Sequence, residues 1–139
     1  MIIEFNDVCE TGIYPIPEII KISSKYGIQE DIYLELWKKE DYYNYFTITK
    51  EESMLYNPYN KRYQEHRGFY IFEDNIHKIC IITDVDDWKF TLRHELTHAK
   101  QSELIGNDLY KKCFDILKPY REFDPFEIQA YMNEERVYG

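Results

Sequence analysis

The chain has 139 residues, a formal net charge of -9 at pH 7 and an aromatic content of 17%. This length suits one domain with a real hydrophobic core, so we expect residues 1–139 to form a single domain. The acidic balance, with no basic patch of interleaved aromatics, argues against nucleic-acid binding, and no apolar window is long enough to span a membrane.

The N-terminal segment and the cysteines favour a cytoplasmic location. Residues 1–7 lack the basic start and the long apolar run of a signal peptide. Cys9, Cys80 and Cys113 are an odd number of widely spaced cysteines, with neither a disulfide framework nor a Cys-x-x-Cys metal site. Cys80 lies in an apolar strand pattern and Cys113 in an apolar helical pattern, so we expect both side chains to be buried.

The first half of the chain contains two helical patterns and one strand pattern. Apolar residues recur at helical spacing through residues 16–26, and Gly27 suits the end of that helix. A second helix is predicted over residues 28–39, and a strand over residues 42–50. Residues 51–65 are polar and rich in turn residues, so no regular element is predicted there.

The second half has stronger patterns. Two strands, at residues 68–72 and 76–83, flank Glu73-Asp74-Asn75 and predict a hairpin. A helix follows over residues 87–104; Asp86 or Asp87 can cap it, and Trp88, Leu92, Leu96 and Ala99 form its apolar face. Gly106-Asn107 ends that helix, and further helices are predicted over residues 109–117 and 125–136.

The motif His94-Glu95-Leu96-Thr97-His98 lies on the helix predicted over residues 87–104. Two histidines four residues apart on a helix point the same way, because four residues are close to one turn. Their imidazoles can bind one metal ion, while the Glu between them acts as a general base, which is the zincin arrangement. The motif therefore predicts one Zn²⁺ per chain, with His94 and His98 as ligands and Glu95 as base.

A zinc ion held by such a motif needs a third protein ligand, and we expect it to be Glu127. The other two histidines, His66 and His77, both precede the motif, and only carboxylates follow it. Asp124 suits the N-cap of the last helix and Pro125 its first position, which places Glu127 in the first turn.

Other carboxylates have weaker support as the third ligand. The helical period turns Glu103 away from the two histidines. Asp108 and Asp115 belong to the connecting segment, whereas Glu134 and Glu135 are expected on a solvated face of the last helix.

With these residues the chain resembles the gluzincins. His94-Glu95-x-x-His98, followed by a helix with Glu127-x-x-Ala130, is similar to their pattern, and most similar to the compact minigluzincins and ImmA/IrrE-type metallopeptidases. Large gluzincins often carry an Asp four residues after the Glu ligand, which orients a metal-binding histidine. That position is Tyr131 here, so either another side chain or a backbone carbonyl must orient the imidazole.

The resemblance implies hydrolysis of peptide bonds by a zinc-activated water. Two neutral imidazoles and one carboxylate leave the ion with net positive charge, which lowers the pKa of its water to about 7. Glu95 then takes the water proton as general base. A further donor must stabilise the oxyanion; Tyr131, one turn after Glu127, is the expected residue, with Tyr120 and His66 as rivals.

Two other functions would use the same residues: a non-catalytic binding or regulatory module that keeps the zinc ligands, and a structural zinc domain. Glu95 favours catalysis over both, because a structural site has no use for a base at that position.

The order of hairpin, motif helix and ligand helix predicts a small α+β domain of zincin type. We expect a short mixed sheet whose edge hairpin packs against the motif helix, with a C-terminal ligand helix. A peptide or protein substrate would add along a free strand edge within residues 69–82 as a further strand. The pattern leaves open which of the two strands is outermost.

Overall fold

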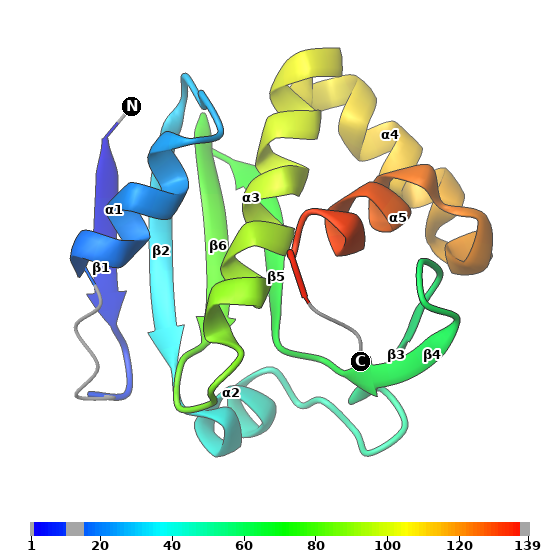
Figure 1. The fold of residues 1–139 in the computed structure, drawn as a ribbon, viewed down its shortest axis with the longest axis horizontal. Coiled ribbons are helices and arrows are strands. Elements are labelled where there is room, and N and C mark those ends of the chain that lie inside the picture. Colours follow the sequence, from blue (N-terminus) through cyan, green and yellow to red (C-terminus); the bar gives the residue numbers. More distant parts are fainter. Residues whose placement is uncertain (1, 11–15, 137–139) are drawn as a thin grey trace.

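The computed structural model describes residues 2–10 and 16–136, so Met1 and residues 11–15 and 137–139 of the predicted domain lie outside it. The described residues form an α+β arrangement of helices around a mixed sheet (Figure 1). Four strands make the main sheet in the order β1-β2-β6-β5, namely β1 (Ile3–Asp7), β2 (Asp31–Trp37), β6 (Ile76–Ile82) and β5 (Gly68–Glu73). The predicted α+β class with a mixed sheet is confirmed.

The direction of the strands decides which of them is at the edge. β1, β2 and β6 are parallel, whereas β5 pairs antiparallel with β6 and has no other partner strand among the described residues. Within the predicted hairpin, β5 is therefore the outermost strand. At Gly68, the first residue of β5, the backbone lies very close to β6, and an added Cβ would be 2.5 Å from the Cys80 carbonyl oxygen.

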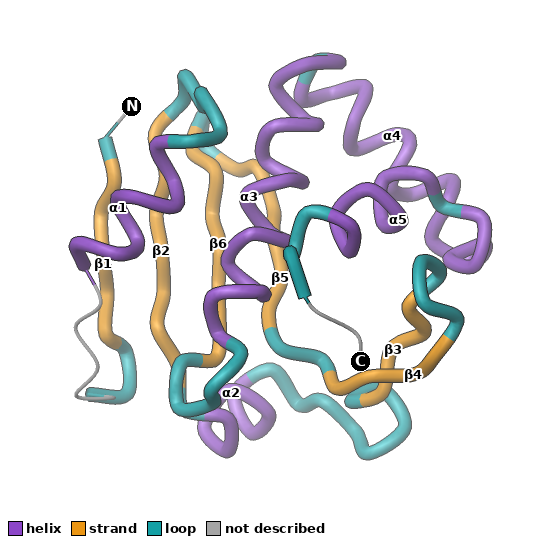
Figure 2. Tube along the Cα trace, in the orientation of Figure 1, coloured by secondary structure: helices purple, strands orange, loops and turns teal. Residues whose placement is uncertain are grey.

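One face of the sheet is covered by α1 (Ile16–Ser24) and α3 (Trp88–Ile105), which Figures 1 and 2 show crossing in front of the strands. Burial of apolar side chains between these layers is the main favourable contribution to folding. The predicted apolar face of the motif helix is confirmed. The buried cluster consists of Ile19, Ile22, Ile28, Ile32, Leu34, Leu36, Ile79, Ile81, Leu92, Leu96 and Ala99.

The other face carries a smaller, aromatic cluster around α2 (Lys39–Tyr45). Tyr42 is fully buried and packs with Trp37, Cys80 and Ile82. Cys80 is thus buried as predicted. Cys113 is only half-buried, because α4 (Asn107–Leu117) buries Tyr110 and leaves most of its other side chains exposed.

Residues 31–37 form strand β2 and not the predicted helix. Ile32, Leu34 and Leu36 are buried while the residues between them are less so, which is the period of two of a strand. Ile32 and Leu36 are also four residues apart, so the same apolar residues fit a helical spacing. The strand forms because β1 and β6 pair with it on both sides.

Two further elements differ from the sequence prediction. Residues 39–45 are the helix α2, although residues 42–50 were expected to be a strand. Tyr42 and Phe46, one helical turn apart, pack together with ring centroids 4.8 Å apart. Residues 51–65, predicted as irregular, contain a hairpin of β3 (Met54–Asn57) and β4 (Arg62–Glu65).

The C-terminal half follows the predictions closely. α3 begins one residue after Asp87, whose side chain does not cap the helix but pairs with Arg136. α5 (Pro125–Met132) is shorter than predicted and is capped as expected, since Asp124 Oδ1 accepts hydrogen bonds from the first turn. Between α4 and α5 lies a 3₁₀ helix, η1 (Lys118–Phe123).

Within the described ranges, no helix combines the length and apolar character needed to cross a membrane.

Candidate metal centre

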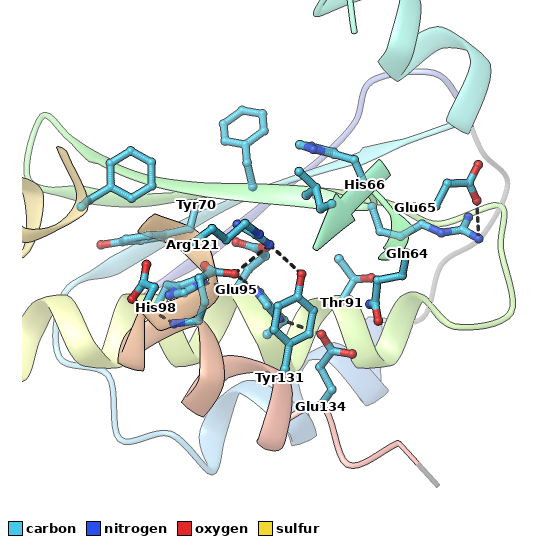
Figure 3. A pocket seen from close by; sticks show the side chains of 18 of the residues that line it. Gln64, Glu65, His66, Tyr70, Thr91, Glu95, His98, Arg121, Tyr131 and Glu134 are labelled. Carbon is cyan, nitrogen blue, oxygen red and sulfur yellow. Dashed lines mark hydrogen bonds and ion pairs between the residues drawn. The ribbon is translucent and has the colours of Figure 1, made fainter. Parts of the chain in front are cut away.

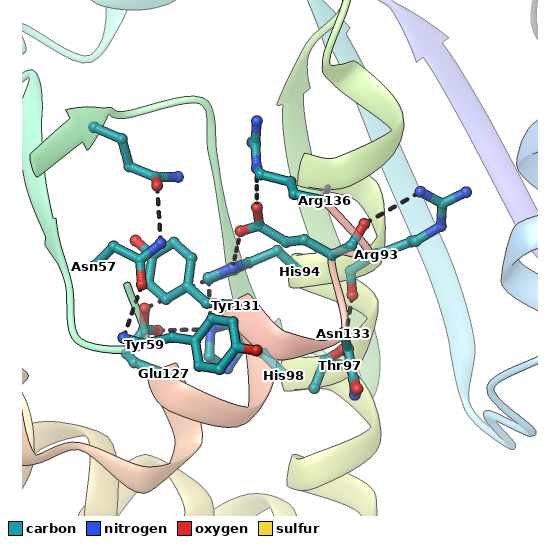
Figure 4. A network of polar contacts seen from close by, with 12 residues as sticks. Asn57, Tyr59, Arg93, His94, Thr97, His98, Glu127, Tyr131, Asn133 and Arg136 are labelled. Carbon is teal, nitrogen blue, oxygen red and sulfur yellow. Dashed lines mark hydrogen bonds and ion pairs between the residues drawn. The ribbon is translucent and has the colours of Figure 1, made fainter. Parts of the chain in front are cut away.

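The predicted ligands, two from α3 and one from α5, converge at one place (Figure 4). His98 Nε2 lies 2.6 Å from Glu127 Oε1, and His94 Nε2 lies 3.4 Å from Glu127 Oε2. One ligand atom from each side chain lies within 4.8 Å of the other two, and all three residues are buried. The group His94, His98 and Glu127 could therefore hold a metal ion.

A glutamine on the motif helix orients His98. The Gln101 amide nitrogen donates to the carbonyl oxygen of Phe126 and to Gln129 Oε1, so the Gln101 Oε1 atom must face the other way. That oxygen lies 2.9 Å from His98 Nδ1 and accepts its proton. The His98 Nε2 atom is thereby directed toward Glu127 and the centre of the group.

A carboxylate orients His94. Glu134 Oε2 lies 2.7 Å from His94 Nδ1, and Arg136 pairs with the other oxygen of the same carboxylate (Figure 4). Glu134 is 2% exposed, so the expectation that it lies on a solvated face is wrong. A carboxylate that accepts from the far nitrogen of a ligating histidine fixes its tautomer and raises its basicity. Glu134 therefore takes the orienting role that Tyr131 cannot take.

The donor set fits a divalent cation. The two Nε2 atoms lie only 3.2 Å apart and both face the Glu127 carboxylate, an arrangement that positive charge between them stabilises. Burial by itself lowers the pKa of His94, but the Glu127 and Glu134 carboxylates outweigh it and raise this pKa to about 10. Two imidazoles and one carboxylate are also the three protein ligands of many catalytic zinc sites.

Glu95 lies beside these ligands without belonging to the group. It is 5% exposed and lines the cleft, and none of the described residues donates a hydrogen bond to its carboxylate. Burial raises the pKa of Glu95, while the neighbouring His94 and His98 oppose that rise. A carboxyl group of raised pKa that faces a cleft is suited to accept a proton.

A cleft of about 500 Å³ opens over the group, between the start of β5 and the helices α4, η1 and α5. Figure 3 shows Glu95, His98, Arg121 and Tyr131 directed into the same space. Much of its wall is apolar. The apolar and aromatic lining residues are Ile48, Leu55, Phe69, Tyr70, Tyr110, Phe114 and Leu117.

The three residues considered as oxyanion donors have different surroundings. Tyr131 is buried with its ring centroid 4.4 Å from that of His94, and its hydroxyl accepts a hydrogen bond from Arg121 at 2.6 Å. His66 also lines the cleft, but its Nε2 lies 2.6 Å from the Tyr42 hydroxyl. Tyr120 is 58% exposed and does not line the cleft.

The remaining carboxylates lie away from the ligand group. Glu103 accepts hydrogen bonds from the backbone N–H groups of Gln29 and Glu30 and lies 2.8 Å from His77 Nε2, so it connects α3 with the sheet. Asp108, Asp115 and Glu135 are exposed, and Glu135 thus lies in solvent as predicted.

Gln101, Glu134 and Arg121 belong to the surroundings of the metal centre but were not predicted as functional residues from the sequence. Gln101 follows His98 by three residues, a helical spacing at which side chains are neighbours, so its role was accessible from the sequence. Glu134 lies beyond the end of α5, in a turn that brings it back to α3. No local signal points to Arg121, because η1 approaches the site only in the folded chain.

Glu134→Gln should weaken metal binding by about 10- to 100-fold, because an amide oxygen is a weaker acceptor for the His94 Nδ1–H than a carboxylate. Competition with a colorimetric chelator measures this affinity. Glu135→Gln, which removes a charge from the exposed neighbour, should leave it unchanged. Equal affinities of the wild type and Glu134→Gln would contradict the orienting role.

Comparison with models of protein families, with curated proteins and with solved structures finds no match to this chain.

Proposed function

We propose that this protein is a small zinc metallopeptidase of gluzincin type with a zincin-like fold. One observation carries the proposal: two imidazole Nε2 atoms and the Glu127 carboxylate converge at the floor of a cleft, and the carboxylate of Glu95 lies beside them as a non-ligand. A structural metal site would have no need for a buried carboxylate that is neither a ligand nor hydrogen-bonded.

The roles of the residues follow from their contacts. His94, His98 and Glu127 would hold Zn²⁺, which when bound supplies a Lewis acid that polarises a carbonyl and lowers the pKa of water to about 7. Glu95 takes the proton of the attacking water and passes it to the leaving amine. Gln101 and Glu134 keep both imidazoles protonated at Nδ1, so that each Nε2 remains a ligand atom.

The substrate is proposed to be a peptide or an extended protein segment. β5 is an edge strand whose first residues, Gly68, Phe69 and Tyr70, line the cleft. Its unpaired backbone groups can accept a peptide as a further strand, and the apolar wall of the cleft suits an apolar side chain of that peptide. Three free cysteines accord with the proposed cytoplasmic location.

The test is cleavage of a complex peptide mixture by the purified chain loaded with one equivalent of Zn²⁺. Mass spectrometry should detect new termini, which disappear after chelation and return when zinc is added back. If the zinc-loaded chain binds peptides but cleaves none of them, the proposal is wrong and the protein is a binding module that keeps the zinc ligands.

A further inference from the structure

Arg121 places a guanidinium group in the cleft, next to a proposed metal ligand. Its Nη2 lies 3.0 Å from Glu127 Oε2 and donates to the Tyr131 hydroxyl at 2.6 Å. Its Nε donates to the carbonyl oxygen of Tyr56, in β3, at 2.7 Å. The side chain comes from η1 and thus contacts both the small hairpin and α5, and three contacts hold its planar group in one orientation.

These contacts leave part of the guanidinium available. Nη1 has no hydrogen-bond partner among the described residues, and the side chain remains 30% exposed while lining the cleft. The Tyr131 hydroxyl accepts from Arg121, so its own proton is not used in that bond. Two donors, one of them positively charged, are therefore held together beside the Glu127 carboxylate.

We propose that Arg121, together with the Tyr131 hydroxyl, binds the oxyanion that develops on the scissile carbonyl; this inference rests on the proposed peptidase function. As the water oxygen adds to the carbonyl carbon, the π electrons move to the carbonyl oxygen and Glu95 takes the water proton. The charge on that oxygen is then met by donors already in place. When the C–N bond breaks, the carbonyl re-forms and the proton goes to the amine.

The local charge explains why a cation is needed here. Glu95, Glu127 and Glu134 line the cleft, in a chain whose net charge is -9, so a negative charge that develops there has three carboxylates as neighbours. Donors fixed in a partly buried site stabilise such a charge without reorganising during the reaction. Arg121 supplies both the positive charge and the fixed geometry.

His66 and Lys118, which also line the cleft, are less suited to this role than Arg121. Burial is the main cause that lowers the pKa of His66 to about 4, and the positive charge of Arg121 is the second, so the His66 imidazole is neutral at pH 7. Its Nε2 already engages the Tyr42 hydroxyl. Lys118 lines the cleft from the same 3₁₀ helix, but it is exposed and makes no ion pair with the described residues. Lys118 therefore serves as a matched control for a cation in the same cleft.

The test uses the Co²⁺-substituted full chain, whose visible spectrum reports ligands that reach the metal. Phenylphosphonate, a tetrahedral anion, and imidazole, a neutral ligand, are titrated separately. Arg121→Ala should weaken phenylphosphonate binding by about 10- to 100-fold, because charge-assisted hydrogen bonds are lost. Imidazole affinity and cobalt stoichiometry should stay unchanged. The phenylphosphonate affinity of Arg121→Lys should lie between those of the wild type and Arg121→Ala, because lysine keeps the positive charge but lacks the planar set of N–H donors.

Lys118→Ala should leave phenylphosphonate affinity unchanged. An equal loss in Lys118→Ala would attribute the effect to the general charge of the cleft and overturn the inference. Unchanged phenylphosphonate affinity in Arg121→Ala would also overturn the inference. So would an equal loss of imidazole affinity in Arg121→Ala, because it would assign Arg121 a purely structural role. If Arg121→Ala does not fold, the phenylphosphonate affinity of Arg121→Lys is compared with that of Lys118→Ala, and the same outcomes support or overturn the inference.

Activity gives a second readout once a substrate is found. Arg121→Ala should lower kcat with little change in KM, and added methylguanidinium should restore part of the rate. Failure to take up any cobalt would reject the metal centre, and with it this inference. Normal cobalt binding with the same phenylphosphonate affinity in wild type and variant would reject only the role of Arg121.

Discussion

Glu95→Gln is expected to keep the metal and to lose hydrolysis by about 10²- to 10⁴-fold, the usual contribution of a positioned general base. The amide has nearly the same shape as the carboxylate but cannot take a proton from water. Because Glu95 is not in the ligand group, its replacement leaves His94, His98 and Glu127 in place. The variant should also be at least as stable, since a buried carboxylate without a hydrogen-bond donor is removed.

Metal analysis and the rate of peptide cleavage measure the two effects on the same preparation. Glu135→Gln, which removes an exposed carboxylate, should retain both the metal and the rate. Cleavage by Glu95→Gln at the wild-type rate would exclude Glu95 as the base. Loss of the metal in Glu95→Gln would instead show that Glu95 helps to bind it.

Removal of a ligand should have the second large effect. His94→Ala or His98→Ala should lower the metal content from near one per chain to almost none, because two protein ligands seldom retain zinc. Glu127→Ala should weaken zinc affinity by about 10-fold or more, since both a bond and a compensating charge are lost. In the wild type, added Zn²⁺ should raise the thermal unfolding midpoint, because it binds only the folded chain.

Two control variants separate loss of a ligand from loss of stability. His66→Ala removes a histidine that lines the cleft but engages Tyr42, and it should retain full zinc stoichiometry. Glu103→Ala removes a carboxylate from the motif helix and should lower stability, because it pairs with buried His77, while zinc affinity stays nearly unchanged. Full metal content in both His94→Ala and His98→Ala would reject the site.

The amino-acid sequence by itself determined those parts of the centre that depend on local geometry. The helical period places His94 and His98 on one side of α3, and the Asp124-Pro125 cap places Glu127 in the first turn of α5. Both effects act within a few residues, so they can be predicted without knowing the rest of the chain. The hairpin of β5 and β6 was predictable for the same reason.

The tertiary structure decided what depends on partners distant in sequence. Ile32, Leu34 and Leu36 fit a helix and a strand alike, and pairing with both β1 and β6 selects the strand. The same pairing makes β6 central and leaves β5 at the edge beside the cleft, a distinction that the hairpin pattern does not contain.

The surroundings of the ligands also arise only from folding. Glu134 reaches His94 across 40 residues of sequence, and Arg121 reaches the backbone of Tyr56 across 65. Charged side chains near a helix end are usually solvated, so their sequence positions alone favour an exposed surface. They become hydrogen-bonded parts of the centre because α5 and η1 pack against α3 and β3, and that packing is a property of the whole chain.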